Sequence, residues 1–390
     1  MIERKKENRR CSRGIWDNSV PGIVFDNNGV SNYAKLFDKL CEAYPKGKEG
    51  LNQWNKIVNL IKVKSTTKKY DCIIGVSGGT DSSYLLHLAK EYKLKPLAVN
   101  LDNGWNSVIA VKNIKKMTAA LNIDLETYVI DYEEIKDLLR SYMLAGLPWI
   151  DIPTDLAIKS VLYRIAAREG ISYVLRGNDF RSEGSQPNEW TYGDGRQLKS
   201  VHKKFGSIKL KTFPNYTIAN LFYYGLIKKI KSVYPFYYLD YNKNRTQDFL
   251  KTNYGWEYYG GHHHENYFTK FSISYWLFEK FGIDKRIITL SAQVLSKEIS
   301  REYALEKISE PAYDLETRDQ MLEYVIKKLD LTQDEFNLIL KSENKTFKDY
   351  PSYDILFNKL LKFSKPFLNL IFLHKPQSIF QYEIRNKESK

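Results

Sequence analysis

The segment GVSGGTDSS, residues 75–83, gathers the side chains in this sequence that are best suited to holding a phosphate. It carries three glycines, four hydroxyl side chains and one carboxylate, and it lies between the apolar run YDCIIGV and a helix-like pattern. A strand, a tight Gly-rich turn and a helix direct backbone N–H groups at an anion. Gly78 and Gly79 let the anion approach the main chain, and Ser77 and Ser82 add hydroxyl donors. We therefore predict a phosphate-binding loop.

The loop differs from two familiar nucleotide-binding motifs. Neither GxxxxGK[ST] nor GxGxxG fits, because the lysine and the glycine spacing are missing. Asp81 would repel a bare phosphate, which makes sense if Mg²⁺ bridges the two or if the residue also caps the helix. A glycine-rich turn with serine caps is the alternative that implies no ligand.

SGGTDSS resembles the SGG-x-D-S signature of the PP-loop ATP pyrophosphatase superfamily. The resemblance implies that the loop grips the β- and γ-phosphates while a nucleophile attacks the α-phosphorus, giving an adenylated intermediate and pyrophosphate. The residues implied to bind pyrophosphate are Ser77, Gly78, Gly79, Asp81 and Ser82. Asp102 ends the run KPLAVNLD, and ligands of open α/β sheets bind at the carboxyl ends of strands. It is a further candidate for the ATP site, through ribose, metal or substrate, with helix capping as its alternative role.

The elements that must position this loop alternate between strand and helix. Short buried-strand runs occur at YDCIIGV, KPLAVNLD, LETYVID and ISYVLRG, and helical stretches lie between them. This alternation predicts an α/β fold, a parallel sheet with helices on both faces. Strand signals fade after about residue 212. We expect an accessory segment over residues 1–64, a PP-loop domain over 65–212 and a mainly helical region over 213–390.

Composition indicates a folded protein of enzyme size. The chain has 390 residues, of which 43% are hydrophobic and 27% charged, so general disorder is excluded. No apolar run is long enough for a membrane span, and the basic N-terminus lacks the apolar core of a secretory signal. Three cysteines suit a reducing compartment. We expect a cytoplasmic protein.

The net charge of +14 points to an anionic partner. Residues 199–251 contain 11 Lys and Arg but only two acids. Nucleic acid, phosphorylated small molecules and an acidic protein all fit this excess, and so does a merely solvated basic face.

Motifs beyond the loop resemble the N-acetyl sugar amidotransferase family, from about Cys11 to Ile308. PTD, the run GN…EG…P..W, VHKKFG, YYGG.H.E and FGIDKR appear in the order typical of that family. Its members convert an acetamido group of a sugar into an acetamidino group for lipopolysaccharide O-antigen and other surface polysaccharides. The resemblance implies ATP and Mg²⁺, an N-acetyl sugar, nucleotide-linked, as substrate, and AMP and pyrophosphate as products.

The candidate site residues fall into three groups. Proposed catalytic residues, including bases that could take protons as the amidine forms, are Asp81, Asp155, His202, His263 and Glu265. Proposed substrate contacts are Asn178, Glu183, Lys270, Lys285 and Arg286. Asp81 is also the tentative Mg²⁺ ligand. Loop capping is the alternative for Asn178 and Glu183, and simple solvation is the alternative for the three cations.

Zinc is not expected. Members of the family commonly begin with a four-cysteine knuckle, CxxC…GVCNYC, but here the matching positions are Cys11, Gly14, Ser31 and Ala34, and one thiolate cannot hold structural zinc. GGHHHE is not a metal motif either, because adjacent histidines on a strand point to opposite faces. We expect hydrogen bonds or packing to keep the knuckle in shape.

Two other classes of function stay open. A tRNA-modifying PP-loop enzyme would explain the positive charge, although no cysteine follows Cys72 for sulfur transfer, so nucleic acid is the less favoured partner. A non-catalytic scaffold derived from an amidotransferase would explain the lost zinc ligands. No glutaminase motif is visible. The resemblance therefore implies a separate glutaminase and a cyclase-like ammonia-channel subunit as partners.

Overall fold

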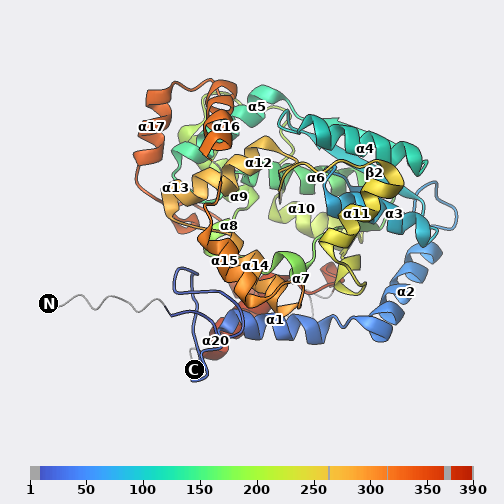
Figure 1. Cartoon of the computed structure of the whole chain (residues 1–390). Coiled ribbons are helices and arrows are strands. Elements are labelled where there is room, and N and C mark those ends of the chain that lie inside the picture. Colours follow the sequence, from blue (N-terminus) through green and yellow to red (C-terminus); the bar gives the residue numbers. More distant parts are fainter. Residues whose placement is uncertain (1–8, 262–263, 314, 364–369, 389–390) are drawn as a thin grey trace.

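The computed structural model describes residues 9–261, 264–313, 315–363 and 370–388. Within them, five parallel strands form one sheet in the order β3-β2-β1-β4-β5 (Figure 1). The strands are β1 (Cys72–Gly75), β2 (Pro96–Asp102), β3 (Leu125–Val129), β4 (Tyr173–Leu175) and β5 (Lys231–Val233). Because all strands are parallel, their carboxyl ends meet at one edge of the sheet. The predicted α/β class is confirmed.

The central strands are buried on both faces, which explains their unbroken apolar sequences. Along β1, Ile73 packs into one core cluster, whereas Cys72 and Ile74 pack into the other. Strand β3 lies at the edge of the sheet, and its side chains alternate between exposed and half-buried positions. The order of the strands follows from how much apolar surface each one must cover.

Helices cover both faces of the sheet and form most of the rest of the molecule (Figure 1). One core joins the sheet to α1 to α4, α11, α14 and α20, and the other joins it to α5, α6, α9, α12, α13, α16 and α17. The helices are α1 (Asn32–Ala43), α2 (Gly47–Lys64), α3 (Thr80–Glu91), α4 (Val108–Ala120), α5 (Tyr132–Leu144), α6 (Ile152–Arg168), α7 (Phe180–Glu183), α8 (Asn188–Thr191), α9 (Gly195–Phe205), α10 (Ile218–Phe222), α11 (Lys243–Tyr254), α12 (Tyr267–Phe271), α13 (Leu277–Phe281), α14 (Arg286–Leu295), α15 (Arg301–Ser309), α16 (Leu315–Lys328), α17 (Gln333–Lys341), α18 (Asp354–Phe363) and α20 (Gln377–Glu388). None of the helices in the described ranges is long and apolar enough to cross a bilayer.

Strand β5 lies beyond residue 212, where strand signals fade in the sequence. It is three residues long and pairs with β4 through Tyr173 and Lys231, Val174 and Ser232, and Leu175 and Val233. A strand that short, with two polar residues, carries too little pattern to be recognised. The sheet therefore draws one strand from the region expected to be helical, while the three-part division itself stays a prediction.

Hydrogen bonds hold the N-terminal segment where family members carry a zinc knuckle. The Cys11 thiol accepts the Ser31 backbone N–H at 3.3 Å, and the Ser31 hydroxyl caps α1 on the Ala34 N–H at 3.2 Å. Arg301 donates to the carbonyls of Cys11 and Gly14 at 3.2 and 3.1 Å. In the described part of the chain, no group of three or more His, Cys, Asp or Glu residues is arranged to hold a metal ion.

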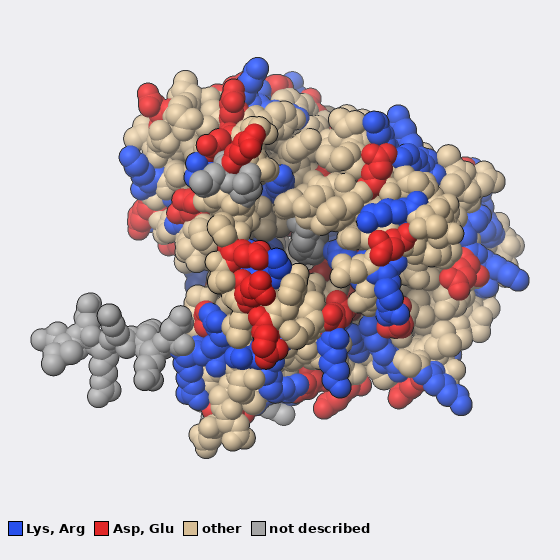
Figure 2. Space-filling view, viewed as in Figure 1, with Lys and Arg blue, Asp and Glu red and all other residues tan. Residues whose placement is uncertain are grey.

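The positive charge is not collected into one continuous stripe on the face shown in Figure 2. Basic and acidic side chains are intermixed over that face. In the segment 199–211, the five lysines at positions 199, 203, 204, 209 and 211 are exposed on the end of α9 and the loop after it. Lys228, Lys229, Arg245 and Lys251 of the basic segment are exposed as well.

Candidate active site at the carboxyl edge of the sheet

The predicted phosphate loop connects the carboxyl end of β1 to the N-terminus of α3. The Ser77 hydroxyl accepts the Gly79 N–H at 3.3 Å, and the Ser82 hydroxyl accepts the Ser77 N–H at 3.2 Å. Gly79 is the N-cap of α3, so the unpaired N–H groups of the first helical turn lie at the loop. The helix dipole adds positive potential at the same point.

Gly78 is required by both its conformation and its neighbours. Its φ is +78°, and a Cβ at this position would lie 2.2 Å from the carbonyl oxygen of Ala110 in α4. The Gly78 carbonyl accepts hydrogen bonds from the indole of Trp256 at 3.1 Å and from Asn113 at 3.3 Å. The Gly78 carbonyl thus ties the loop to α4 and to the residues that follow α11.

Several residues in the ranges 241–261 and 264–265 contact the loop, and not all of them were foreseen from the sequence. The Tyr259 hydroxyl accepts the Thr80 N–H at 3.2 Å, and the Ser77 hydroxyl donates to a Glu265 carboxylate oxygen at 3.2 Å. Tyr241 donates its hydroxyl to Asp81. These residues, which we call the clasp (residues 241–261 and 264–265), join the C-terminal half of the chain to the predicted phosphate loop.

The clasp also supplies the cation that the loop sequence lacks. The Lys243 ammonium lies 3.3 Å from an Asp81 carboxylate oxygen, so the aspartate does not face the site as an uncompensated charge. Burial lowers the pKa of Lys243, but the carboxylates of Asp81 and Glu183 outweigh it and hold that pKa above its ordinary value. Lys243 therefore stays charged beside the loop at neutral pH.

A cavity of about 280 Å³ opens beside the loop at the carboxyl ends of β1, β2 and β4. Its lining includes Ser77 from the loop, Asp155 from α6, Asn178 after β4 and Glu265 from the clasp. Asp155 accepts the Trp149 indole N–H at 2.7 Å. The sheet thus brings together two of the five predicted catalytic residues, Asp155 and Glu265, in the cavity that the phosphate loop borders.

A second cavity of about 630 Å³ adjoins the first, because Asn178 lines both. Seven charged residues line the second cavity: Glu183, Lys243, Asp284, Lys285, Arg286, Glu298 and Lys307. Asn178 and Glu183 contact each other, with the amide nitrogen 3.4 Å from the carboxylate. Two adjoining cavities, one at the loop and one rich in charge, provide places for two reactants.

Two titratable groups in the larger cavity are shifted toward neutral pH. Burial lowers the pKa of Lys285 to about 8, although Asp155 and Glu183 oppose the shift, and its ammonium lies 4.2 Å from the centre of the Trp149 ring. Burial and the nearby Asp179 raise the pKa of Glu298 to about 7. Glu298 was missed by the sequence analysis, since nothing in its local sequence signals burial.

Three predicted residues are engaged elsewhere. His202 lies 3.0 Å from a carboxylate oxygen of Asp137, an ion pair that ties α9 to α5, and it lines neither cavity. Lys270 also lines neither, and burial lowers its pKa. Arg286 borders the larger cavity, but its guanidinium is bound to Asp284 at 2.7 Å and to the carbonyls of three residues at 307, 310 and 311.

The remaining candidates from the sequence are His263 and Asp102. His263 lies outside the described residues. Asp102 ends β2 as expected, but it accepts the Gly104 N–H at 2.9 Å, and its neighbours Leu101 and Asn103 line the cavity instead. The alternative role of Asp102 as a helix cap is wrong, because Ser107 caps α4 through the Ala110 N–H at 3.1 Å.

The residue that suits a Mg²⁺ ion in the structure is not the one expected from the sequence. Both Asp81 carboxylate oxygens already receive donors, from Tyr241 and Lys243, so the tentative assignment of Asp81 as the metal ligand does not fit. Glu265 presents a carboxylate in the cavity beside Ser77. Because Mg²⁺ is commonly held by one or two carboxylates together with substrate phosphates, Glu265 is the residue that suits it.

The parallel sheet order, with a strand, the SGGTDSS loop and a helix in succession, defines an α/β fold whose loop is similar to the SGG-x-D-S signature of PP-loop ATP pyrophosphatases. Residues 265–364 match the family model for the C-terminal domain of LPS biosynthesis proteins that are WbpG-like. The expected relation to lipopolysaccharide biosynthesis proteins is confirmed over that region.

Individual proteins are similar to this chain over only part of its length or at low sequence identity. An uncharacterized protein, MJ1599, of Methanocaldococcus jannaschii is 31% identical over 121 residues, which is 31% of this chain and 42% of that protein, so the chain spans less than half the length of this curated relative. Among solved structures, the NH3-dependent NAD synthetase from Campylobacter jejuni is 17% identical with a TM-score of 0.26, covering 38% of this chain and 58% of that one. The U34-tRNA thiolase NcsA from Methanococcus maripaludis, solved with its [4Fe-4S] cluster, is 13% identical with a TM-score of 0.30, covering 75% and 88%.

Proposed function

We propose that the protein is an ATP-dependent, AMP-forming amidotransferase acting on a nucleotide-linked N-acetyl sugar. It would adenylate the acetamido group and replace its oxygen by ammonia, giving an acetamidino sugar for lipopolysaccharide O-antigen or another surface polysaccharide. One observation carries the proposal: the cavity at the ATP loop adjoins a larger, charged cavity at Asn178. The family match over residues 265–364 supports the biosynthetic context.

Two steps account for the reaction. An acetamido oxygen attacks the α-phosphorus of ATP, the bond to the bridging oxygen breaks, and pyrophosphate leaves. Ammonia then adds to the imidoyl carbon, the carbon–oxygen bond breaks, AMP leaves with the original amide oxygen, and the surplus protons are released. Neither step proceeds readily without activation, because an amide carbon is a poor electrophile and its oxygen a poor nucleophile.

The chain supplies binding, orientation and proton acceptors in this scheme. The loop N–H groups and Ser77 bind the leaving pyrophosphate, and Lys243 adds positive charge beside it. Asp155, which lines the smaller cavity, is the carboxylate in position to take protons from attacking ammonia. Mg²⁺, held through Glu265 and the phosphates, would supply neutralisation of the developing negative charge. A closed site excludes the water that would destroy the adenylate.

The substrate cavity should be sensitive to pH through Lys285. Its pKa of about 8 means that the ammonium is present below pH 8 and is lost as the pH rises through 8. If it binds an anionic group of the nucleotide sugar, KM for the sugar should increase several-fold between pH 7 and 9. Lys285→Arg should keep a low KM to pH 9 or above, because arginine stays charged there. An identical rise in both proteins would remove Lys285 from substrate binding.

Ammonia would come from partner proteins, a glutaminase and a cyclase-like channel subunit. The five exposed lysines at the end of α9 and in the following loop are the surface proposed for docking them. This assignment rests on charge and exposure alone.

The decisive experiment uses the purified protein with ATP, Mg²⁺, ammonium and a panel of nucleotide-linked N-acetyl sugars. We expect AMP and pyrophosphate in equal amounts, together with a sugar product in which NH replaces O by mass. Turnover with tRNA and none with any sugar would instead establish the tRNA-modifying alternative. No turnover with either, despite ATP binding, would favour a scaffold.

A further inference from the structure

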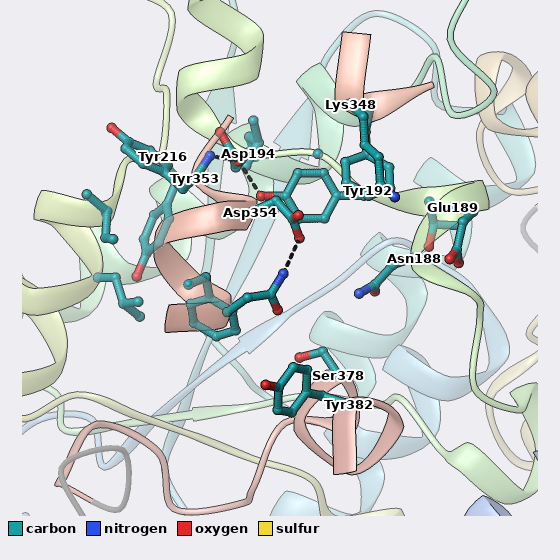
Figure 3. A pocket seen from close by; sticks show the side chains of 18 of the residues that line it. Asn188, Glu189, Tyr192, Asp194, Tyr216, Lys348, Tyr353, Asp354, Ser378 and Tyr382 are labelled. Carbon is teal, nitrogen blue, oxygen red and sulfur yellow. Dashed lines mark hydrogen bonds between the residues drawn. The ribbon is translucent and has the colours of Figure 1, made fainter. Parts of the chain in front are cut away.

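Three polar side chains lie behind the ATP loop and have no role in the scheme above. Arg176 directly follows β4 and lines the smaller cavity. Since Ile74 of β1 pairs with Leu175, Arg176 lies beside Gly75 at the start of the loop. Lys159 of α6 and Tyr216, which precedes α10, line a third cavity of about 580 Å³. Figure 3 shows Tyr216 on the wall of this cavity with Tyr192, Tyr353 and Tyr382.

Arg176 lines the smaller cavity together with Ile158, the residue before Lys159, so α6 separates it from the third cavity by a single position. The Lys159 ammonium lies 4.3 Å from the centre of the Tyr216 ring. Burial lowers the pKa of Lys159 to about 8, and the positive charge of Arg176 lowers it further in the same direction. Arg176 also acts on the Tyr216 hydroxyl, where it opposes the rise in pKa that burial produces. Two cations and a phenol therefore share one weakly solvated region.

Glu189, Asp194 and Asp354 line the same cavity, but in the described ranges none of them forms an ion pair or hydrogen bond with Lys159 or Arg176. The Nε of Arg176 and the hydroxyl of Tyr216 are buried without a hydrogen-bond partner, and Tyr216 as a whole is only 5% exposed. No carboxylate contributes to the pKa shift of Lys159. Asp194, on the wall of the same cavity, instead accepts the Tyr192 hydroxyl and the N–H groups of residues 196, 197 and 353.

Buried cations without an anion are costly, and so is a buried hydroxyl without a partner. An oxyanion bound between them would satisfy all three groups, since a guanidinium and an ammonium form strong charge-assisted hydrogen bonds to carboxylate or phosphate oxygens. The triphosphate of ATP already has the loop and the N-terminus of α3. Lys159 and Tyr216 face a cavity that none of the loop residues lines.

We propose that Arg176, Lys159 and Tyr216 form a binding site for an oxyanion, a carboxylate or a phosphate, carried by the second substrate and separate from the triphosphate of ATP. The assignment of that anion to a second substrate rests on the proposed two-substrate reaction. The site holds the end of the second substrate that is remote from the reacting acetamido group. Binding of ATP at the loop cannot position that end.

The test is a binding measurement that needs no turnover, so it is independent of whether amidine forms. The protein is saturated with α,β-methylene-ATP, which occupies the loop, and is then titrated by calorimetry with inorganic phosphate, with glucuronate and with neutral glucose. We expect at least one anion to bind and glucose not to bind. Arg176→Gln and Lys159→Gln should each weaken anion binding about tenfold or more. Lys56→Gln, which removes an exposed cation of α2, is the matched control and should leave it unchanged.

The relative affinity of phosphate and glucuronate identifies which oxyanion the site takes. The methylene-ATP affinity should stay within about threefold of wild type in both variants. Failure of both anions to bind the analogue-loaded protein overturns the proposal, as does a large loss of methylene-ATP affinity in Arg176→Gln, which would assign the guanidinium to ATP. If a glutamine variant does not fold, Arg176→Lys and Tyr216→Phe are measured in its place. We expect Arg176→Lys to retain part of the anion affinity and Tyr216→Phe to lower that affinity.

Discussion

Replacing Ser77 and Asp81 together by alanine is expected to reduce AMP and pyrophosphate formation by at least about a thousandfold. Removing one preorganised donor from such a site typically costs about 10²- to 10³-fold in rate. Here the Ser77 change removes the hydroxyl that organises the loop and contacts Glu265. The Asp81 change leaves the buried Lys243 ammonium without its carboxylate. Initial rates of pyrophosphate release at saturating ATP measure the effect.

The matched control for this double variant is Asp124→Ala with Ser172→Ala. Asp124 precedes β3 and Ser172 precedes β4, so both changes lie at the amino edge of the same sheet, away from the loop. Asp124 makes an exposed ion pair with Lys69, which contributes little to stability. We expect near-normal activity in the control. Activity within tenfold of wild type in the Ser77 and Asp81 variant would show that the loop does not bind the reacting nucleotide.

Gly78→Ala is the second change for which we expect a large effect. A non-glycine residue at φ +78° costs roughly 1–2 kcal/mol. The added Cβ would also lie 2.2 Å from the Ala110 carbonyl oxygen, a backbone atom that cannot swing away as a side chain can. We expect the free energy of unfolding to fall by about 3 kcal/mol or more and nucleotide binding to be lost. Urea unfolding and titration with a fluorescent ATP analogue measure the two effects.

Gly255→Ala separates the two contributions. Gly255 ends α11 with φ +61°, but a Cβ there would meet nothing within 4 Å. We expect it to cost about 1 kcal/mol and to leave nucleotide binding intact. If Gly78→Ala and Gly255→Ala lower the free energy of unfolding equally, α4 must move to accommodate the Cβ at position 78, and the loop tolerates the substitution.

The loop and its strand were predictable because their signal is local. Strand β1, the glycines and the first turn of α3 follow one another over about a dozen residues, and each has a separate physical reason to be there. The clasp was not predictable in the same way. Tyr241 and Lys243 reach Asp81 from about 160 positions along the chain, and a lysine or a tyrosine in sequence carries no mark of its distant partner.

His202 was expected in the site from the sequence, but the structure places it outside both cavities. A histidine in a motif typical of the family suggested a base, whereas its Nε2 pairs with Asp137 and joins two helices. Arg176 was equally visible, immediately after the ISYVLRG strand, but a single arginine has too many ordinary roles to be selected from sequence. What distinguishes it is its buried and unpaired Nε, a property of the folded chain alone.

The ion pair between Asp81 and Lys243 has a thermodynamic consequence. Asp81 belongs to the loop, while Lys243 faces the larger cavity, so any ligand that changes the position of one partner changes the energy of the other. Affinities at the two cavities are then linked, and linkage is reciprocal. By whatever factor a ligand of the loop alters the dissociation constant of a ligand in the larger cavity, the second ligand alters that of the first, and one half-buried pair of charges couples them.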